Sequence, residues 1–117
     1  MRGIRILSPV LSDIDTAASW YDENGYEGLG ERFIRSFYAS LTRIQTQGEM
    51  YRTSYRDFRK FLIPSFPYFI YFSLHSDEWI VPLVIHTSRR PSLTKTLLNQ
   101  RTKAEQADAG NRAKPGA

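Results

Sequence analysis

The sequence predicts one small α+β domain in which a pair of helices packs on a β-sheet. Three observations lead to this fold class. The chain has 117 residues, which is the usual size of a single domain. Its first half repeats apolar residues at helical spacing, and its second half is rich in aromatic and β-branched residues, as strands are. With 41% hydrophobic and 14% aromatic residues, it has enough apolar material for one core.

The N-terminal elements are a short strand and an amphipathic helix. Residues 4–7 are predicted to form the strand, which Ser8-Pro9 ends. Ser12 is a favourable N-cap, so the helix is expected over residues 13–23 and stops at Asn24-Gly25.

A second helix follows after a short link. Phe33, Phe37, Leu41 and Ile44 lie on one helical face, which predicts a helix over residues 28–47. Because the link between the two helices is short, they are expected to pack antiparallel as a hairpin.

The remaining elements are strands. After a polar loop, antiparallel strands are expected over residues 58–63, 68–74 and 79–86, in the overall order β-α-α-β-β-β. Pro82 interrupts the last of them, which predicts either an edge strand or a bulge. One sheet face is expected to pack against the helical hairpin, leaving the other open to solvent or to a partner.

The C-terminal segment is polar and rich in small residues. Residues 92–100 are compatible with a last short helix. The domain is therefore expected to occupy residues 1–98, with residues 99–117 as a disordered tail.

The positive charge is concentrated in the middle of the chain. Residues 32–95 contain ten basic and four acidic side chains, whereas residues 1–31 are mainly acidic. This asymmetry suits an acidic partner, either a nucleic acid or an acidic protein segment. The alternative is a solvated basic face without a ligand.

Several functional classes lack the residues that they require. The chain has no cysteine, and His75 and His86 are its only histidines, so neither a metal nor a cofactor is expected. No secretory signal and no long apolar run is visible, so no membrane span is expected and the cytoplasm is the expected location.

A succession of short motifs resembles a known family. In chain order, these are Ser8-Pro9, Asp13-Ile14, Trp20-Tyr21, Gly28-Leu29-Gly30, Phe33, Arg59, Phe66-Pro67-Tyr68-Phe69-Ile70-Tyr71, His86 and Arg89-Arg90-Pro91. Together, over residues 4–91, they resemble the RelE/ParE superfamily of toxins from type II toxin–antitoxin modules, and in particular its ParE-like branch, often described as plasmid stabilisation proteins.

The resemblance implies a RelE/ParE-like fold and a cognate antitoxin that binds and neutralises the chain in a hetero-oligomer. It also implies one of two activities. ParE-like members inhibit DNA gyrase without catalysis, and RelE-like members cut mRNA on the ribosome without a metal. Inhibition of gyrase is the preferred activity, because no tyrosine follows Tyr71, and Lys60 and Lys95 are the only lysines before the tail. An inactive or differently targeted member is the remaining possibility within the family.

The candidate site residues follow from these readings. If the chain is an RNase, the catalytic candidates are Arg59, His86 and Arg89. The candidates for binding the target or the antitoxin are basic and aromatic: Arg56, Arg59, Lys60, Tyr68, Tyr71, Arg89 and Arg90.

The same residues also allow interpretations that do not involve a toxin. A non-catalytic nucleic-acid-binding domain would also combine cations with stacking rings. Arg59 could pair with a helix carboxylate such as Asp13, and Trp20-Tyr21 could be core residues.

Overall fold

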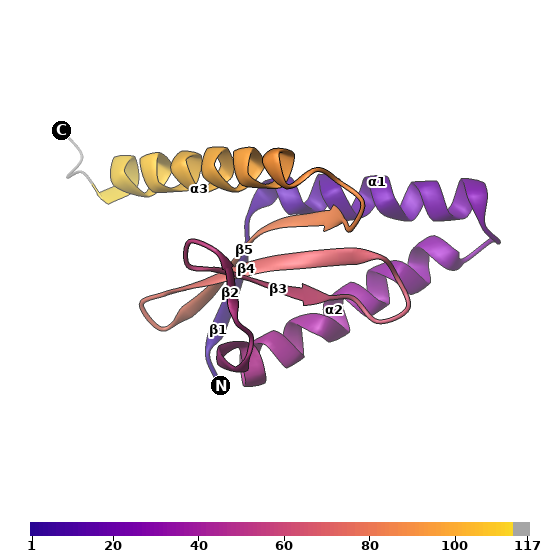
Figure 1. The fold of residues 1–117 in the computed structure, drawn as a ribbon, viewed down its shortest axis with the longest axis horizontal. Helices are drawn as coiled ribbons and strands as arrows, with labels where there is room; N and C mark the ends of the chain where they lie inside the picture. Colours follow the sequence, from indigo (N-terminus) through magenta and orange to yellow (C-terminus); the bar gives the residue numbers. More distant parts are fainter. Residues whose placement is uncertain (114–117) are drawn as a thin grey trace.

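A five-stranded sheet lies between a helical hairpin and a C-terminal helix (Figure 1). This computed structural model describes residues 1–113, and side chains as far as residue 105. The elements in chain order are β1 (Gly3–Ile6), α1 (Ser8–Asn24), α2 (Leu29–Gln47), η1 (a 3₁₀ helix, Gly48–Met50), β2 (Thr53–Tyr55), β3 (Phe58–Leu62), β4 (Tyr68–His75), β5 (Glu78–His86) and α3 (Pro91–Ala113).

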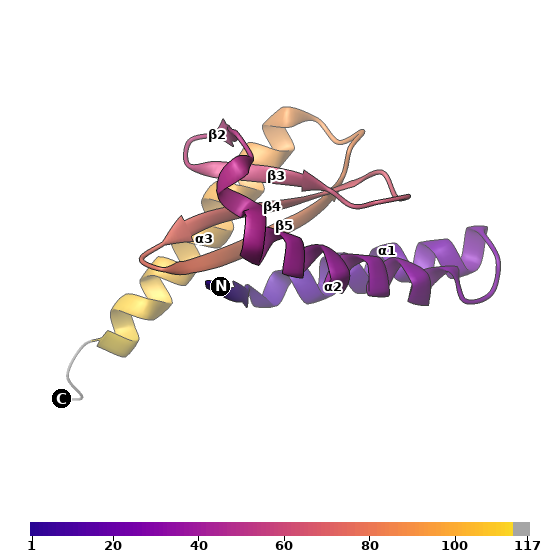
Figure 2. The same cartoon turned by 90° about the horizontal axis from the view of Figure 1, so that it is seen from below.

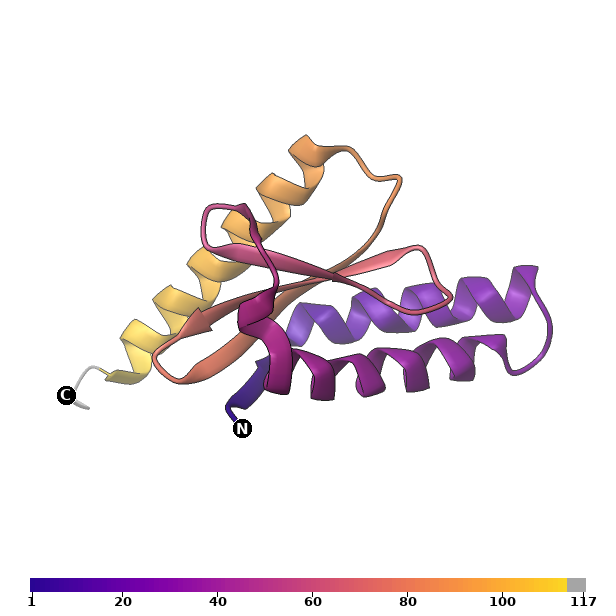
Figure 3. The ribbon, with the colours of Figure 1, turned by 60° about the horizontal axis from the view of Figure 1, so that its bottom comes forward.

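The two helices form the predicted hairpin. Phe33 and Phe37 of α2 are fully buried against α1 and the sheet. Beside the turn that joins the two helices, the Asp22 carboxylate accepts a hydrogen bond from the Gly30 N–H at 2.8 Å. Gly30 is needed there, because a Cβ atom at this position would lie 2.4 Å from the Ala18 carbonyl oxygen. The hairpin projects past the end of the sheet, as Figure 3 shows.

The start of α1 differs from the prediction. The helix begins at Ser8 with Leu7 as N-cap, not at Ser12. Pro9 lies in its first turn, where a helix needs no N–H donor and where the fixed φ of proline is already helical. Ser8-Pro9 therefore ends the strand and begins the helix at once.

The sheet is mixed, with the strand order β1-β5-β4-β3-β2. The pairs β2–β3, β3–β4 and β4–β5 are antiparallel as expected, but β1 pairs with β5 in parallel, from Gly3↔Glu78 to Ile6↔Val81. The chain passes through the hairpin and three strands before β5 comes to lie beside β1. The three-residue strand β2 arises in the segment predicted to be a loop.

Pro82 lies in a bulge of β5, an inner strand of the sheet, just beyond the last residue that pairs with β1. The register of β4 and β5 shifts by one residue, so that Val81 and Pro82 together stand opposite Phe72. The extra residue also changes which face the odd-numbered side chains occupy. Val81 packs on the hairpin side, whereas Leu83 packs on the opposite side.

The second face of the sheet is covered by α3, so the expected open face is wrong for this part of the sheet. Leu98 is fully buried there against a cluster contributed by β3, β4 and β5. Its buried partners are Phe58, Tyr71, Leu83 and Ile85. The helix crosses the strands obliquely on the side away from the hairpin (Figures 1 and 2).

The expected short helix and disordered tail are also corrected. Residues 99–113 continue α3, because apolar packing at Leu98 and an ion pair at Arg101 hold the helix on the domain. The tail prediction for residues 114–117 falls outside the described residues.

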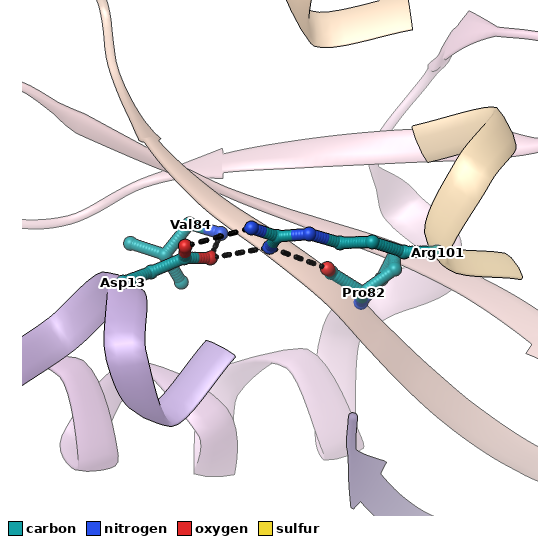
Figure 4. A network of polar contacts seen from close by, with 4 residues as sticks. All are labelled: Asp13, Pro82, Val84 and Arg101. Atoms are coloured by element: carbon teal, nitrogen blue, oxygen red, sulfur yellow. Dashed lines mark hydrogen bonds and ion pairs between the residues drawn. The ribbon is translucent and has the colours of Figure 1, made fainter. Parts of the chain in front are cut away.

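The ion pair joins α3 to α1 and β5 (Figure 4). The Arg101 guanidinium donates to both Asp13 carboxylate oxygens, at 2.6 and 3.0 Å, and to the Pro82 carbonyl oxygen at 3.1 Å. Asp13 also accepts the Val84 N–H at 3.0 Å. The two side chains are only 14% and 16% exposed. Together they bind the Pro82 carbonyl oxygen and the Val84 N–H, two backbone groups in the part of β5 that does not pair with β1.

We predict that Asp13→Asn lowers the free energy of unfolding by about 2–3 kcal/mol, because it leaves the shielded Arg101 charge without its counter-charge. Urea unfolding measures the change. Asp15→Asn is the matched control, since Asp15 is an exposed carboxylate on the same helix and forms no ion pair with the described residues. Equal stabilities of the two variants would contradict the assignment.

Candidate functional site

A large hollow lies between the helical hairpin, the turn from β3 to β4, and the link from β5 to α3. We call it the cationic groove, and its volume is about 1220 Å³. Its charged lining residues are Arg32, Arg89 and Arg90, and no Asp or Glu lines it. Because arginines without neighbouring carboxylates create a positive potential, the groove suits an acidic ligand.

Aromatic rings form the floor of the groove. Tyr21 packs edge-on against Phe66, with ring centres 5.0 Å apart, and Phe33 packs against Tyr68 at 5.1 Å. Trp20 contacts Tyr21 but remains 55% exposed, so the expectation of a core residue is wrong for Trp20. An indole at a groove edge can contribute a large apolar contact area to a partner.

His86 lies where β5 ends, and a hydrogen bond fixes the orientation of its ring. The Ser88 N–H donates to the His86 Nδ1 atom at 3.0 Å. Nδ1 is therefore an acceptor, so the neutral ring carries its proton on Nε2. The edge of the ring meets Tyr68 at a centre-to-centre distance of 5.1 Å. Burial raises the pKa of Tyr68, which the nearby Arg89 charge partly opposes. Tyr68 is thus a neutral phenol at physiological pH.

A second, smaller hollow lies on the other side of His86 and Arg89, which line both. We call it the basic pocket, and its volume is about 220 Å³. It is bounded by β3, β4 and the first turns of α3, and it receives Lys60 and Lys95 in addition to Arg89. Tyr71 forms part of its wall, but this residue is only 7% exposed, and burial raises its pKa.

The predicted site residues separate into three groups. Tyr68, Arg89 and Arg90 line the cationic groove. Lys60, Tyr71 and Arg89 line the basic pocket, although Tyr71 is too buried to be a docking surface. Arg56 lines neither hollow, and its guanidinium carbon lies 5.3 Å from the centre of the Tyr55 ring.

Arg59 lies apart from the other candidates. Its guanidinium donates to the backbone carbonyl oxygens of Glu49, at 3.1 Å, and Tyr51. It also lies 5.9 Å from the centre of the buried Trp79 ring. Neither the groove nor the pocket includes it. Arg59 therefore anchors the segment after α2, and its proposed pairing with Asp13 is wrong, because Asp13 pairs with Arg101.

Sequence reasoning missed four contributors to these hollows. They are Trp20 and Arg32 in the groove and Thr94 and Lys95 in the pocket. The aromatic ring of Trp20 and the charge of Arg32 are sequence features that could have marked these two residues as candidates. Thr94 and Lys95 depend on where α3 docks, which no local pattern specifies.

The described residues contain neither a cluster of metal-ligating side chains nor a membrane-spanning helix. Over the described part of the chain, no group of three or more His, Cys, Asp or Glu side chains is placed to hold a metal ion. Among the helices of residues 1–113, none combines the length and the apolar character that crossing a bilayer requires.

Comparison with known proteins gives a match in structure but none in sequence. No protein-family model matches the chain, and no curated protein matches it. A solved structure described as the chromosomal ParDE TA system from P. aeruginosa superposes with a TM-score of 0.67 at 11% sequence identity. The match covers 75% of this chain and 98% of that one.

The chain has a ParE-like fold. The predicted fold class, an N-terminal strand and helical hairpin on a sheet, is thereby confirmed. The ParE-like neighbour is covered almost completely, so about a quarter of the present chain has no counterpart in it.

We predict that Arg59→Ala acts on stability, because two backbone carbonyls would lose their charged donor. The free energy of unfolding should fall by about 1–3 kcal/mol. Arg89→Ala is the control, since Arg89 is exposed and should change it by less than about 0.5 kcal/mol. Chemical denaturation of both variants measures the difference. If Arg59→Ala leaves the free energy of unfolding unchanged, Arg59 does not anchor this segment and is a free surface residue.

Proposed function

We propose that the chain is the toxin of a type II toxin–antitoxin pair, that a cognate antitoxin neutralises it, and that it inhibits DNA gyrase in the ParE manner. The observation that carries the proposal is the cationic groove on a ParE-like fold. The groove combines arginines, the exposed indole of Trp20 and no lining carboxylate.

The proposed occupant of the groove is an acidic, amphipathic segment of the antitoxin. A volume of about 1220 Å³ is larger than most small-molecule sites, which span roughly 300–1,000 Å³, and suits a peptide segment. Acidic side chains of the segment would face Arg32, Arg89 and Arg90, while its apolar side chains would contact Trp20 and the neighbouring rings.

The separation of the catalytic candidates favours the non-catalytic activity. Cleavage of RNA at the 2′-OH needs a base, an acid and a cation around one phosphate. His86 and Arg89 lie together, but Arg59 is held by backbone carbonyls elsewhere on the sheet. A gyrase inhibitor needs only a binding surface.

The second candidate function is an mRNA endonuclease of the RelE type. The observation that favours it is the group formed by His86, Arg89 and Lys60 around the basic pocket, where an imidazole lies among cations. A plain nucleic-acid-binding domain would use the same residues without cleavage.

Expression in bacteria tests the toxin assignment. We expect the chain alone to reduce colony counts at least about tenfold and the neighbour-encoded antitoxin to restore growth. The double variant Arg89→Ala/Arg90→Ala should lose most of the toxicity while staying folded, because it removes two of the three charges of the groove. Arg43→Ala/Arg52→Ala is the matched control, with two exposed arginines outside the groove.

Purified protein distinguishes the targets. Blocked gyrase supercoiling with intact ribosome-bound mRNA is the expected result. Cleaved mRNA whose cleavage is abolished by His86→Ala would reverse the ranking of the two activities. Normal growth at high expression, together with inactivity in both assays, would reject the toxin assignment.

A further inference from the structure

We propose that the basic pocket is a binding site for one phosphate-type oxyanion, built where the first turns of α3 meet the outer face of the sheet. The inference does not depend on the toxin function, because Lys60, Thr94 and Lys95 line this hollow and not the cationic groove, although His86 and Arg89 line both. Lys60 comes from β3, Lys95 from α3, and Arg89 from the link between β5 and α3.

The charge around the pocket is one-sided. Its lining residues include Lys60, Arg89, Lys95 and His86, and no Asp or Glu is among them. Like charges gathered around a small hollow repel one another, and this repulsion is strongest where water is partly excluded. An anion bound between them would convert the repulsion into attraction.

The cations rest on aromatic rings and have no carboxylate partners. The Lys60 Nζ atom lies 4.5 Å from the centre of the Phe69 ring, and the Lys95 Nζ atom lies 5.4 Å from the centre of the Tyr55 ring. Within residues 1–105, neither lysine forms an ion pair, whereas Arg101 does. A cation–π contact holds the ammonium group in place without using its hydrogen-bond donors.

The Thr94 hydroxyl adds a neutral donor. Thr94 is 8% exposed as a residue and lines the pocket. Its position on the pocket wall would let the hydroxyl donate to an oxyanion held by the two lysines.

The size of the pocket limits the ligand to one anionic group. A volume of about 220 Å³ lies below the range of sites that enclose whole small molecules. A phosphate group fits the chemistry, because it accepts several charged hydrogen bonds at once. The group could belong to a nucleic-acid backbone or to a free phosphate, and the test below separates these two sources.

The site is a property of this chain and its third helix. Thr94 and Lys95 lie on α3, whose first turns form one wall of the pocket. Without α3, Lys60 and Arg89 would face solvent and not a pocket.

Titration of the full-length protein with inorganic phosphate at constant ionic strength tests the proposal, with backbone NMR shifts as the readout. We expect saturable shifts at Lys60, Thr94 and Lys95. Lys60→Gln/Lys95→Gln should weaken binding at least about tenfold. Arg43→Gln/Lys103→Gln removes the same charge from exposed positions outside the pocket and should change it less than about twofold.

A short single-stranded oligonucleotide without terminal phosphate is the second probe. If it binds through the pocket residues more tightly than inorganic phosphate does, the backbone of a nucleic acid is the source of the group. If inorganic phosphate binds as tightly or more tightly, the source is a free phosphate. The proposal is overturned if neither probe shifts the pocket residues, or if both double variants weaken binding equally. The two proposals fail separately, because Lys60→Gln/Lys95→Gln changes no residue of the cationic groove and growth inhibition is measured independently of phosphate binding.

Discussion

The contact between Asp13 and Arg101 holds the C-terminal helix on the domain. Strand β1 ends at Ile6 and pairs with β5 only as far as Val81, so the rest of β5 has no neighbouring strand on that side. Asp13 accepts the Val84 N–H and Arg101 donates to the Pro82 carbonyl oxygen, so two side chains replace the missing strand. Because one of them belongs to α3, completing the sheet edge also fixes that helix.

The position of α3 determines what the outer face of the sheet can do. The helix buries the apolar residues of that face and converts them from a docking surface into a second small core. Its first turns close the basic pocket and complete one wall of the cationic groove. The two hollows share His86 and Arg89, so the link between β5 and α3 is the point where both possible ligands would approach each other.

Local patterns were sufficient for most of the fold. The spacing of Phe33, Phe37, Leu41 and Ile44 predicted α2 almost to the residue, and the aromatic run predicted β4. For α3 they predicted only a short helix over residues 92–100, because the rest of the described helix has few apolar residues and its docking depends on a contact with Asp13, 88 residues away. One signal was present. The apolar run of β5 does not alternate, which indicates a strand buried on both faces.

The site was predictable where only charge and ring type mattered, as at Tyr68, Arg89 and Arg90. Arg59 and Lys60 show where it was not. Neighbouring residues of a strand point to opposite faces, so the two could not share one site on an extended β3. Applying that alternation would have assigned Arg59 to the hairpin side, where it meets Trp79.

Native-state amide hydrogen exchange tests most directly whether α3 is docked as described. The Val84 amide and the amides from Thr94 to Thr102 should be protected to within about tenfold of those in α2, because their opening would require separation of α3 from the sheet. Exchange of the α3 amides at the rate of an unstructured peptide, with α2 still protected, would contradict the account.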